Sequence, residues 1–449
     1  YDISLGLVGS EMCIRDRTDA KLKNLWGRYV VDAKEIPIYK LPMKNKDSLR
    51  IHTPFFRDVV KVKTGYMGSS ISVNYNPQDE ISEIQERAVN TILRDFSIIN
   101  NEKDENSSMV RDCAAMSRGY RLMYNKDGVV RIKNLKPYQV YVIEGEGSKY
   151  DPDQAMWYYK VDDLWIAEVY DRKEVSIYKE TTGGEFQLHE RMAHTFDAVP
   201  IIPCFNNEEM IAEPEDAMGL MDSYDRTLSN SANLIQASVD SFLLIQGENL
   251  DIDNDFLNML SELRIALVKP SDNMSFVERN INDVHVMNNL KTLRDNIYAM
   301  SSSFDSYTDV GGGLPVIGYK QKTHGLELSC KETERKFQSS LYRQYELYFQ
   351  WLKRWKNITL SHLDLEFTFT RSYPKNIQEE AATLAVLTTQ VSRKDAYSLM
   401  SFIDNPDEWL ERFDEEQDAY RSFLDTENTG IQLDDSEPTD NPEDRGSGQ

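Results

Sequence analysis

The sequence has no long hydrophobic run, few cysteines and few histidines. Nowhere in its 449 residues does an apolar stretch approach the roughly 18 residues that a membrane span needs, so we expect no membrane partner. The four cysteines lie far apart and form no CxxC pair, which gives no sign of a disulfide framework or a zinc ribbon. We therefore expect core thiols in a reducing compartment.

Catalytic signatures are also missing. The chain contains only six histidines, scattered along its length, and it has no Gly-x-Ser-x-Gly elbow. An acid–base pair cannot be assembled from these residues. We predict no enzymatic activity, no metal and no cofactor.

The charge balance is strongly acidic. Lys and Arg number 51 against 75 Asp and Glu, a formal net charge of −24, which excludes a basic clamp around DNA. Hydrophobic residues make up 40% of the chain, a globular share, and the length predicts roughly two to four structural units. Residues 1–17 lack an initiating Met, a basic segment and a long apolar core. We interpret them as a spurious leader outside the fold and not as a signal peptide.

The first half of the chain combines helix and strand patterns. Alternating apolar residues predict a strand over 71–75, and apolar residues spaced by three and four predict a helix over about 80–100. The expected buried stripe of this helix is Ile81, Ile84, Ala88, Ile92 and Phe96. Between residues 119 and 205 the period is two, and Asp127-Gly128 separates two such runs as a hairpin turn does. This stretch is predicted to be antiparallel β.

The second half is mostly helical. A helix of roughly 33 residues is predicted to begin near Pro214 and to continue to Gly247, because no stronger breaker intervenes. Its apolar stripe is narrow, which predicts neighbours beside its polar residues. These are Asp216, Asp222, Asp225, Arg226, Asn230, Asn233 and Gln236. Further helices are predicted over 256–263, 288–300, 326–356, 377–389 and 393–403, followed by an acidic helix that ends at about residue 424. Extended segments are predicted over 265–268, 274–277 and 363–369.

Three motifs suggest chemistry but lack an essential residue. Four acids have the spacing of a calcium loop: Asp251, Asp253, Asp255 and Glu262. Phe256 stands where that loop needs glycine, so an acidic turn is the better interpretation. His189 and His194 are five residues apart and could not share one metal from one helix. The glycines at 313–318 have phosphate-loop spacing, but Tyr319 replaces the required lysine.

A glycine-rich loop over 301–325 carries the candidate site residues. Lys320, Lys322 and His324 stand at its end, in an otherwise acidic protein, as contacts to a nucleic-acid phosphate would. Taken alone, the same residues also fit a solvated loop. The loop is longer than typical connections, which indicates either function or disorder.

Several short segments follow one another in an order typical of one family. They are Phe55-Phe56, Val59-Val60 and Lys63-Thr64-Gly65-Tyr66-Met67-Gly68; Pro137-Tyr138; Val199-Pro200-Ile201-Ile202-Pro203; Asn206-Asn207; Leu220-Met221-Asp222-Ser223-Tyr224-Asp225 with Ser229; and Phe367-Thr368-Phe369-Thr370-Arg371-Ser372-Tyr373-Pro374. The set resembles the siphovirus-type portal proteins of tailed bacteriophages, also called head–tail connectors. The resemblance covers about residues 20–424.

The resemblance implies an α+β portal fold with a β-rich wing, a long-helix stem, a small α/β clip and a helical crown. Twelve copies would form a ring around a channel, with Lys320, Lys322 and His324 on a tunnel loop that touches DNA. The implied divisions are 18–212 (wing), 213–247 (first stem helix), 248–287 (clip), 288–300 (second stem helix), 301–325 (tunnel loop), 326–374 (long helix and return strand of the wing), 375–424 (crown) and 425–449 (disordered acidic tail).

The implied function is a conduit for double-stranded DNA at one capsid vertex, used in packaging and in ejection. The implied partners are the terminase large subunit, the major capsid and scaffolding proteins and the head–tail adaptor. The protein would be assembled in the host cytoplasm and reside in the virion. Two alternatives stay open: an oligomeric scaffold that does not contact DNA, and a metal-dependent nuclease or other capsid-associated enzyme.

Overall fold

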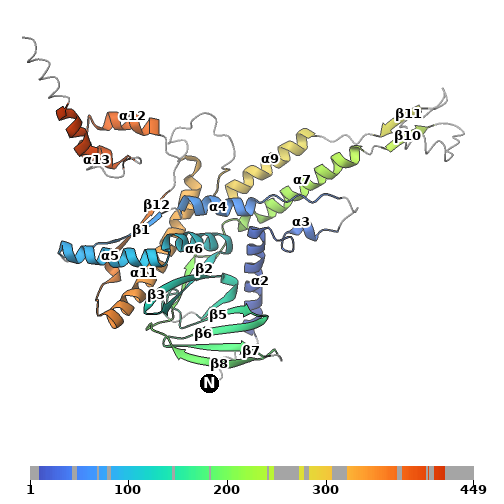
Figure 1. The fold of residues 1–449 in the computed structure, drawn as a ribbon. Helices are drawn as coiled ribbons and strands as arrows, with labels where there is room; N and C mark the ends of the chain where they lie inside the picture. Colours follow the sequence, from blue (N-terminus) through green and yellow to red (C-terminus); the bar gives the residue numbers. More distant parts are fainter. Residues whose placement is uncertain are drawn as a thin grey trace, which may run out of the picture. The chain divides into compact units, whose positions relative to one another are not determined.

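The computed structural model describes most of the chain. The described residues are 10–42, 48–67, 70–77, 82–143, 147–181, 184–239, 242–246, 273–277, 283–305, 321–371, 377–400, 403 and 409–419. They belong to two compact units, one formed by Tyr1–Gly311 with Lys320–Ser372 and the other by Gly312–Tyr319 with Tyr373–Gln449. The larger unit mixes helices with antiparallel sheets (Figure 1), so the predicted α+β class is confirmed.

The larger unit contains antiparallel sheets, and two of them lie in the stretch 119–205 that was predicted to be antiparallel β. Strand β1 (Ser70–Tyr75) pairs with β12 (Leu365–Thr370). Strands β2 (Arg118–Lys126), β3 (Val129–Leu135) and β9 (Ile201–Phe205) form a sheet in the order β3-β2-β9. The five-stranded sheet runs β4 (Val140–Ile143), β5 (Gln154–Val161), β6 (Leu164–Tyr170), β7 (Glu174–Glu180) and β8 (Phe186–Ala193).

Turn chemistry explains why the β2–β3 hairpin forms where the sequence predicts it. Asp127 has φ 55° and Gly128 has φ 74°, and Lys126 pairs with Val129 across the two-residue turn. A tight hairpin turn needs positive φ at both positions, which aspartate tolerates and glycine adopts freely. Strand β8 lies within the stretch predicted to be antiparallel β, and all eight of its residues are exposed.

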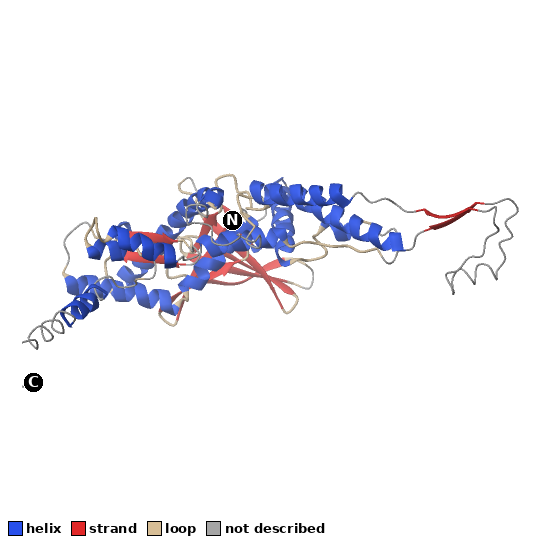
Figure 2. Cartoon of the chain, turned by 90° about the horizontal axis from the view of Figure 1, so that it is seen from above, coloured by secondary structure: helices blue, strands red, loops and turns tan. Residues whose placement is uncertain are grey.

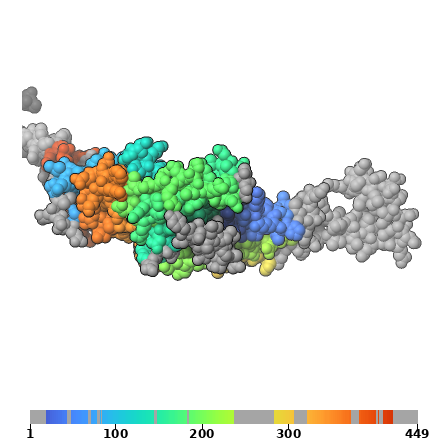
Figure 3. Space-filling model, turned by 90° about the horizontal axis from the view of Figure 1, so that it is seen from below, coloured from blue at the N-terminus to red at the C-terminus, as the bar shows by residue number. Residues whose placement is uncertain are grey.

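Helix α11 (His324–Lys356) organises the main core. Its predicted apolar row is buried at Phe337, Leu341, Tyr345 and Leu352, and only Trp355 at its end is largely exposed. The row packs on β9 and β12 and on helix α5 (Glu83–Ile99). In Figure 3 this helix, in orange, and strands β7 and β8, in green, occupy adjacent parts of one surface.

The predicted helix over about 80–100 exists, and its predicted buried stripe is right at Ile92 and Phe96 but wrong at Ile84 and Ala88. Val89, Leu93 and Phe96 face the core, whereas Ile84 is 81% exposed. Both rows have helical spacing, and only the packing against α11 selects between them. The neighbouring helix α6 (Glu102–Met116) was missed because its buried face includes polar residues, Glu102, Asn106 and Asp112 among them.

The N-terminal helices are α2 (Ser10–Val30), α3 (Pro37–Lys40) and α4 (Phe55–Met67). Helix α2 begins at Ser10, so it includes part of the segment that the sequence analysis set aside. Short 3-10 turns follow at Pro137–Gln139, Glu215–Ala217 and His362–Asp364. No helix within the described ranges is long and apolar enough to cross a membrane.

The predicted helix from Pro214 to Gly247 is wrong in length. Helix α7 spans Met218–Val239 and is followed by strand β10 (Phe242–Gln246). The apolar run Phe242-Leu243-Leu244-Ile245 instead pairs antiparallel with β11 (Asn273–Val277), which confirms the predicted extended segment there. Helix α9 (Asp283–Met300) then returns along α7 and begins before the predicted Asn288. Figures 1 and 2 show α7 and α9 side by side.

The smaller unit is helical where it is described. It contains α12 (Ile377–Leu387), α13 (Arg393–Ser398) and a helix over 409–419, as predicted for this part of the chain. Tyr397, Met400 and Ile403 form its small core. The predicted helix over 256–263, the extended segment over 265–268 and the acidic tail over 425–449 lie outside the described residues.

Candidate functional site

The loop expected to carry the functional cations begins and ends at one place in the larger unit. The Lys322 ammonium lies 5.9 Å from the centre of the Phe304 ring. A side chain at Gly325 would meet the Cα atom of Ser302 at 3.9 Å. Residues 301–305 and 321–325 therefore lie against each other, and we refer to them as the loop base.

Two of the three predicted site residues are described. Lys322 and His324 are exposed at the loop base, whereas Lys320 lies outside the described residues. Thr323, between them, is buried, and its carbonyl accepts a hydrogen bond of 2.9 Å from the Glu327 N–H at the start of α11. The helix thus fixes the backbone from which the exposed side chains of Lys322 and His324 project.

A buried lysine holds α11 next to the loop base. Lys63, on α4, is fully buried, and its ammonium donates to Asn206 Oδ1 at 2.9 Å, Glu213 Oε2 at 2.6 Å and Ser329 Oγ at 2.9 Å. Burial alone would raise the pKa of the Glu213 carboxyl, but the Lys63 charge and hydrogen bonds from its neighbours hold that pKa below its ordinary value. The pair joins α4, the segment before α7, and α11.

A second polar cluster pins the same helix from the end of β12. Arg371 donates from Nε to Glu327 Oε2 at 3.0 Å and also pairs with Glu334. Tyr66 donates its hydroxyl to Glu327 at 2.8 Å. Burial would raise the pKa of Glu327, yet the hydrogen bonds from Arg371 and Tyr66 and the Arg371 charge lower it. We call both clusters together the loop clamp: Lys63, Tyr66, Asn206, Glu213, Glu327, Ser329, Glu334 and Arg371.

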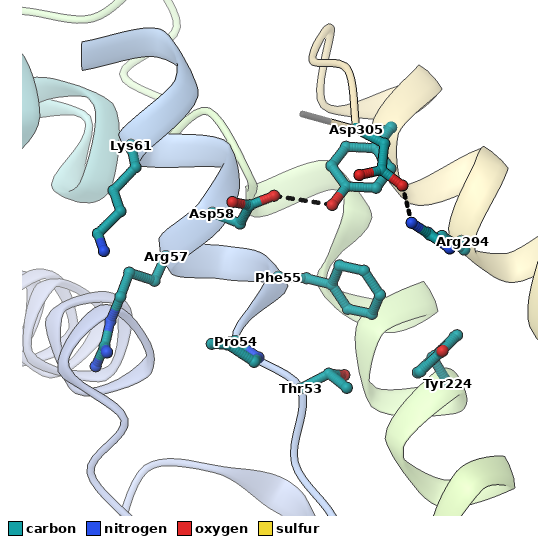
Figure 4. A pocket seen from close by; sticks show the side chains of 10 residues that line it. Thr53, Pro54, Phe55, Arg57, Asp58, Lys61, Tyr224, Arg294 and Asp305 are labelled. Carbon is teal, nitrogen blue, oxygen red and sulfur yellow. Dashed lines mark hydrogen bonds and ion pairs between the residues drawn. The ribbon is translucent and has the colours of Figure 1, made fainter. Parts of the chain in front are cut away.

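A cavity of about 350 Å³ opens at the root of the α7–α9 hairpin, beside the loop base (Figure 4). Phe55 forms T-shaped ring pairs with Tyr224 and Tyr298, with ring centres 4.9 and 5.9 Å away. Tyr298 donates to Asp58 Oδ2 at 2.8 Å, and burial together with this carboxylate raises the pKa of Tyr298. Arg294, Asp305, Arg57 and Lys61 complete the lining, and Arg294 pairs with Asp305 at the start of the loop.

The polar side of α7 is covered by the chain itself. The segment 49–53, here called the strap, runs along the helix, and its odd-numbered residues bind side chains spaced by four. The Leu49 N–H donates to Asn233 Oδ1 at 2.6 Å, the Ile51 N–H to Ser229 Oγ at 2.8 Å, and the Thr53 N–H to Asp225 Oδ1 at 2.9 Å. Asn233 and Ser229 also donate to the carbonyls of Leu49 and Ile51.

The strap fits α7 because the spacing of alternate residues in an extended chain nearly equals the spacing of every fourth residue in a helix. Four helical residues advance about 6 Å, and two extended residues advance about 6.6 Å. The His52 ring adds a contact of 2.5 Å from Nδ1 to Asp225 Oδ2, and Arg28 binds Asp222 through two hydrogen bonds of 2.9 and 3.0 Å. Neighbours were predicted beside the polar residues of this helix, and for Asp222, Asp225 and Asn233 these neighbours belong to the same chain.

The motifs set aside as metal or nucleotide sites gain no support from the structure. Within the described ranges, no group of three or more His, Cys, Asp or Glu residues could hold a metal ion. The calcium-like acids at 251–262 and the glycines at 313–318 lie outside those ranges. His189 is exposed on β8, and His194 Nε2 lies 2.8 Å from the Asp171 carbonyl oxygen.

The predicted core thiols are confirmed where they are described, since Cys113, Cys204 and Cys330 are all buried and free. The side chain of Cys13 is outside the described part. Sequence reasoning missed the loop clamp, although one signal was available. Lys63 stands on the apolar face of its helix, four residues from Val59 and from Met67.

Comparison with known proteins identifies the class as the portal proteins of phages. A family model described as "Phage portal protein, SPP1 Gp6-like" matches residues 29–422, and the chain belongs to this family. The portal protein of Bacillus phage SPP1 is 23% identical over 316 residues, which cover 68% of this chain and 61% of that protein. The chain thus matches less than two thirds of the length of that relative.

A solved structure titled "Neck of native GTA particle computed with C12 symmetry" is also similar. It aligns with a TM-score of 0.47 at 11% sequence identity, covering 78% of this chain and 90% of that chain. The family resemblance drawn from the sequence motifs is confirmed by the family match and by the SPP1 relative. Residues of those motifs, Lys63, Tyr66, Asn206 and Arg371, meet in the loop clamp.

Proposed function

We propose that copies of this chain form a ring at one vertex of a phage capsid and that double-stranded DNA passes through the ring during packaging and ejection. The observation that carries the proposal is the family match, which extends over residues 29–422. The α7–α9 hairpin supports it physically, because a two-helix hairpin leaves broad faces uncovered within one copy and gains stability from lateral neighbours.

The proposed divisions follow the portal architecture. Residues 18–212 form the wing, 213–247 and 288–300 contain the stem helices, 248–287 the clip, 301–325 the tunnel loop, 326–374 the long helix and return strand, and 375–424 the crown. The loop clamp supports the assignment of the loop, because it fixes α11 where the loop re-enters the fold. A loop held at its base keeps its position in a channel while its tip meets the DNA.

Lys320, Lys322 and His324 are proposed to touch the duplex transiently. The chain has a net charge of −24, so the ring as a whole repels phosphate, and a few lysines on the loop supply weak, localised contacts. Weak contacts suit a conduit, since each additional neutralised phosphate strengthens binding and slows sliding. The proposed docking partners are the terminase large subunit, the head–tail adaptor and the capsid and scaffolding proteins.

Electron microscopy of the purified full chain tests the ring. We expect perforated rings in top views, at protein concentrations where the chain assembles. Compact single copies at high concentration, with no annular particles, would contradict the proposal.

A packaging assay separates a DNA conduit from a scaffold that does not contact DNA. Replacing Lys320 and Lys322 with Ala should change the rate of DNA packaging while rings still form. Unchanged packaging by this variant would favour the scaffold. Divalent-dependent cleavage of DNA by the purified chain would instead favour the nuclease.

A further inference from the structure

Helix α7 has three sides, and two of them are occupied within one copy. Met221 and Tyr224 face the cluster that contains Ile297 and Tyr298 of α9. The strap covers the side that carries Asp225, Ser229 and Asn233.

The third side of α7 is open. Ser223, Arg226 and Asn230 are exposed, and they lie about 140° to 200° around the helix axis from Met221, at about 100° per residue. This open side points away from α9 of the same copy. Arg226 is its charged residue, and no carboxylate within the described ranges pairs with it.

Helix α9 has a matching outer side. Asn288, Thr292 and Asp295 are exposed and lie at least about 140° around the axis from the buried Ile297. Asp295 is the acid on this side, and it forms no ion pair with any residue that the structure describes. The two sides are of similar polarity, and Arg226 and Asp295 carry opposite charges. Lys291 is also exposed, at the edge of this side and one turn from Asp295.

The heights of the two charges agree as well. Tyr224 of α7 and Tyr298 of α9 both pack against the Phe55 ring, and the helices run in opposite directions. Counting along both helices from these two tyrosines places Arg226 level with Asn296. Asp295 is then one residue away, about 1.5 Å along the axis, which an arginine side chain can reach.

We propose that neighbouring copies pack the open side of α7 against the outer side of α9 of the next copy, with Arg226 paired to Asp295 of that copy. This inference rests on the proposed ring and names the surface through which it closes. Two different surfaces that face opposite ways on one hairpin make a head-to-tail contact, and such contacts close into rings. The open side of α7 is proposed to be covered by a second copy of this chain, because Arg226 and Asp295 carry opposite charges. Every copy also presents these two sides in opposite directions, so each copy can bind one neighbour on either side.

Charge reversal in the full-length protein tests the pairing. Arg226→Asp places two carboxylates together and should weaken association of neighbouring copies at least about tenfold. Asp295→Arg should do the same, and the double variant Arg226→Asp/Asp295→Arg should restore assembly. Arg94→Asp is the matched control, because Arg94 is exposed on α5 outside the hairpin. Mass photometry over a concentration series measures the fraction assembled, and circular dichroism checks that each variant is folded.

Each outcome decides between the two proposals. If the wild-type chain forms no rings, the proposed function fails irrespective of the pairing. If the wild-type chain forms rings, single variants that assemble as well as the wild type overturn the pairing, and so does a double variant that is not restored. Loss in both single variants, recovery in the double variant and normal assembly of the Arg94 control would establish the pair.

Discussion

Replacement of the buried lysine gives the sharpest test of how the loop is held. Lys63→Met keeps much of the side-chain volume and removes the ammonium that binds Asn206, Glu213 and Ser329. Glu213 would then be a buried carboxylate with no cation beside it. Breaking a buried ion pair in this way costs about 3–5 kcal/mol, because the remaining charge has lost both water and its partner.

The magnitude follows from burial. The Lys63 side chain is 1% exposed and that of Glu213 is 7% exposed, so solvent cannot replace the missing interaction. The double variant Lys63→Met/Glu213→Gln removes both charges and should recover at least half of the loss. Lys61→Met is the matched control on the same helix, since Lys61 is exposed and should change the free energy of unfolding by less than about 0.5 kcal/mol.

Urea unfolding followed by circular dichroism measures these differences for the full chain. The reasoning is refuted if Lys63→Met costs less than about 1 kcal/mol, or if the Lys61 control costs as much. Failure of the double variant to recover stability would assign the loss to packing and not to the unpaired carboxylate.

Three further predictions concern the same region. The pKa of Glu213 is lower in the folded protein than its ordinary value of 4.5. The ionised carboxylate therefore stabilises the fold fully above pH 4.5, and this stabilisation is lost as the pH falls through the lowered pKa. The Tm should decline between about pH 5 and 3, and Glu213→Gln should reduce that decline. Asn233→Ala removes two hydrogen bonds to the strap and should cost about 1–2 kcal/mol in urea unfolding, whereas Asn230→Ala, on the exposed side, should be neutral. Tyr298→Phe leaves Asp58 without its hydroxyl donor and should cost about 1 kcal/mol, and an unchanged unfolding midpoint would contradict that role.

Local sequence patterns were sufficient to predict those elements that have a single, regularly spaced apolar face or a turn with a specific backbone requirement. The row from Phe337 to Leu352 repeats over many turns, so α11 and its buried side could be predicted. Asp127-Gly128 fixed a hairpin because positive φ is a local requirement. The family motifs likewise predicted the class of protein.

Long-range interactions explain what the sequence did not reveal. The run from Phe242 to Ile245 has no local reason to leave a helix, and it does so because a strand distant in sequence pairs with it. Neighbours were predicted beside the polar residues of α7 without a means of identifying them, and a strap more than 170 residues away in sequence binds Asp225, Ser229 and Asn233. The role of the basic residues in the loop stays a prediction, and no local pattern indicated the buried clamp at the base of the loop.

The match between strap and helix restricts how α7 can move along its own axis. A displacement of one or two residues would separate every hydrogen bond of the strap at once, because its binding side chains recur only every fourth residue. The next alignment of the two repeats occurs after a step of about 6 Å. Any sliding of this helix past the strap is consequently a jump between discrete positions and not a gradual adjustment.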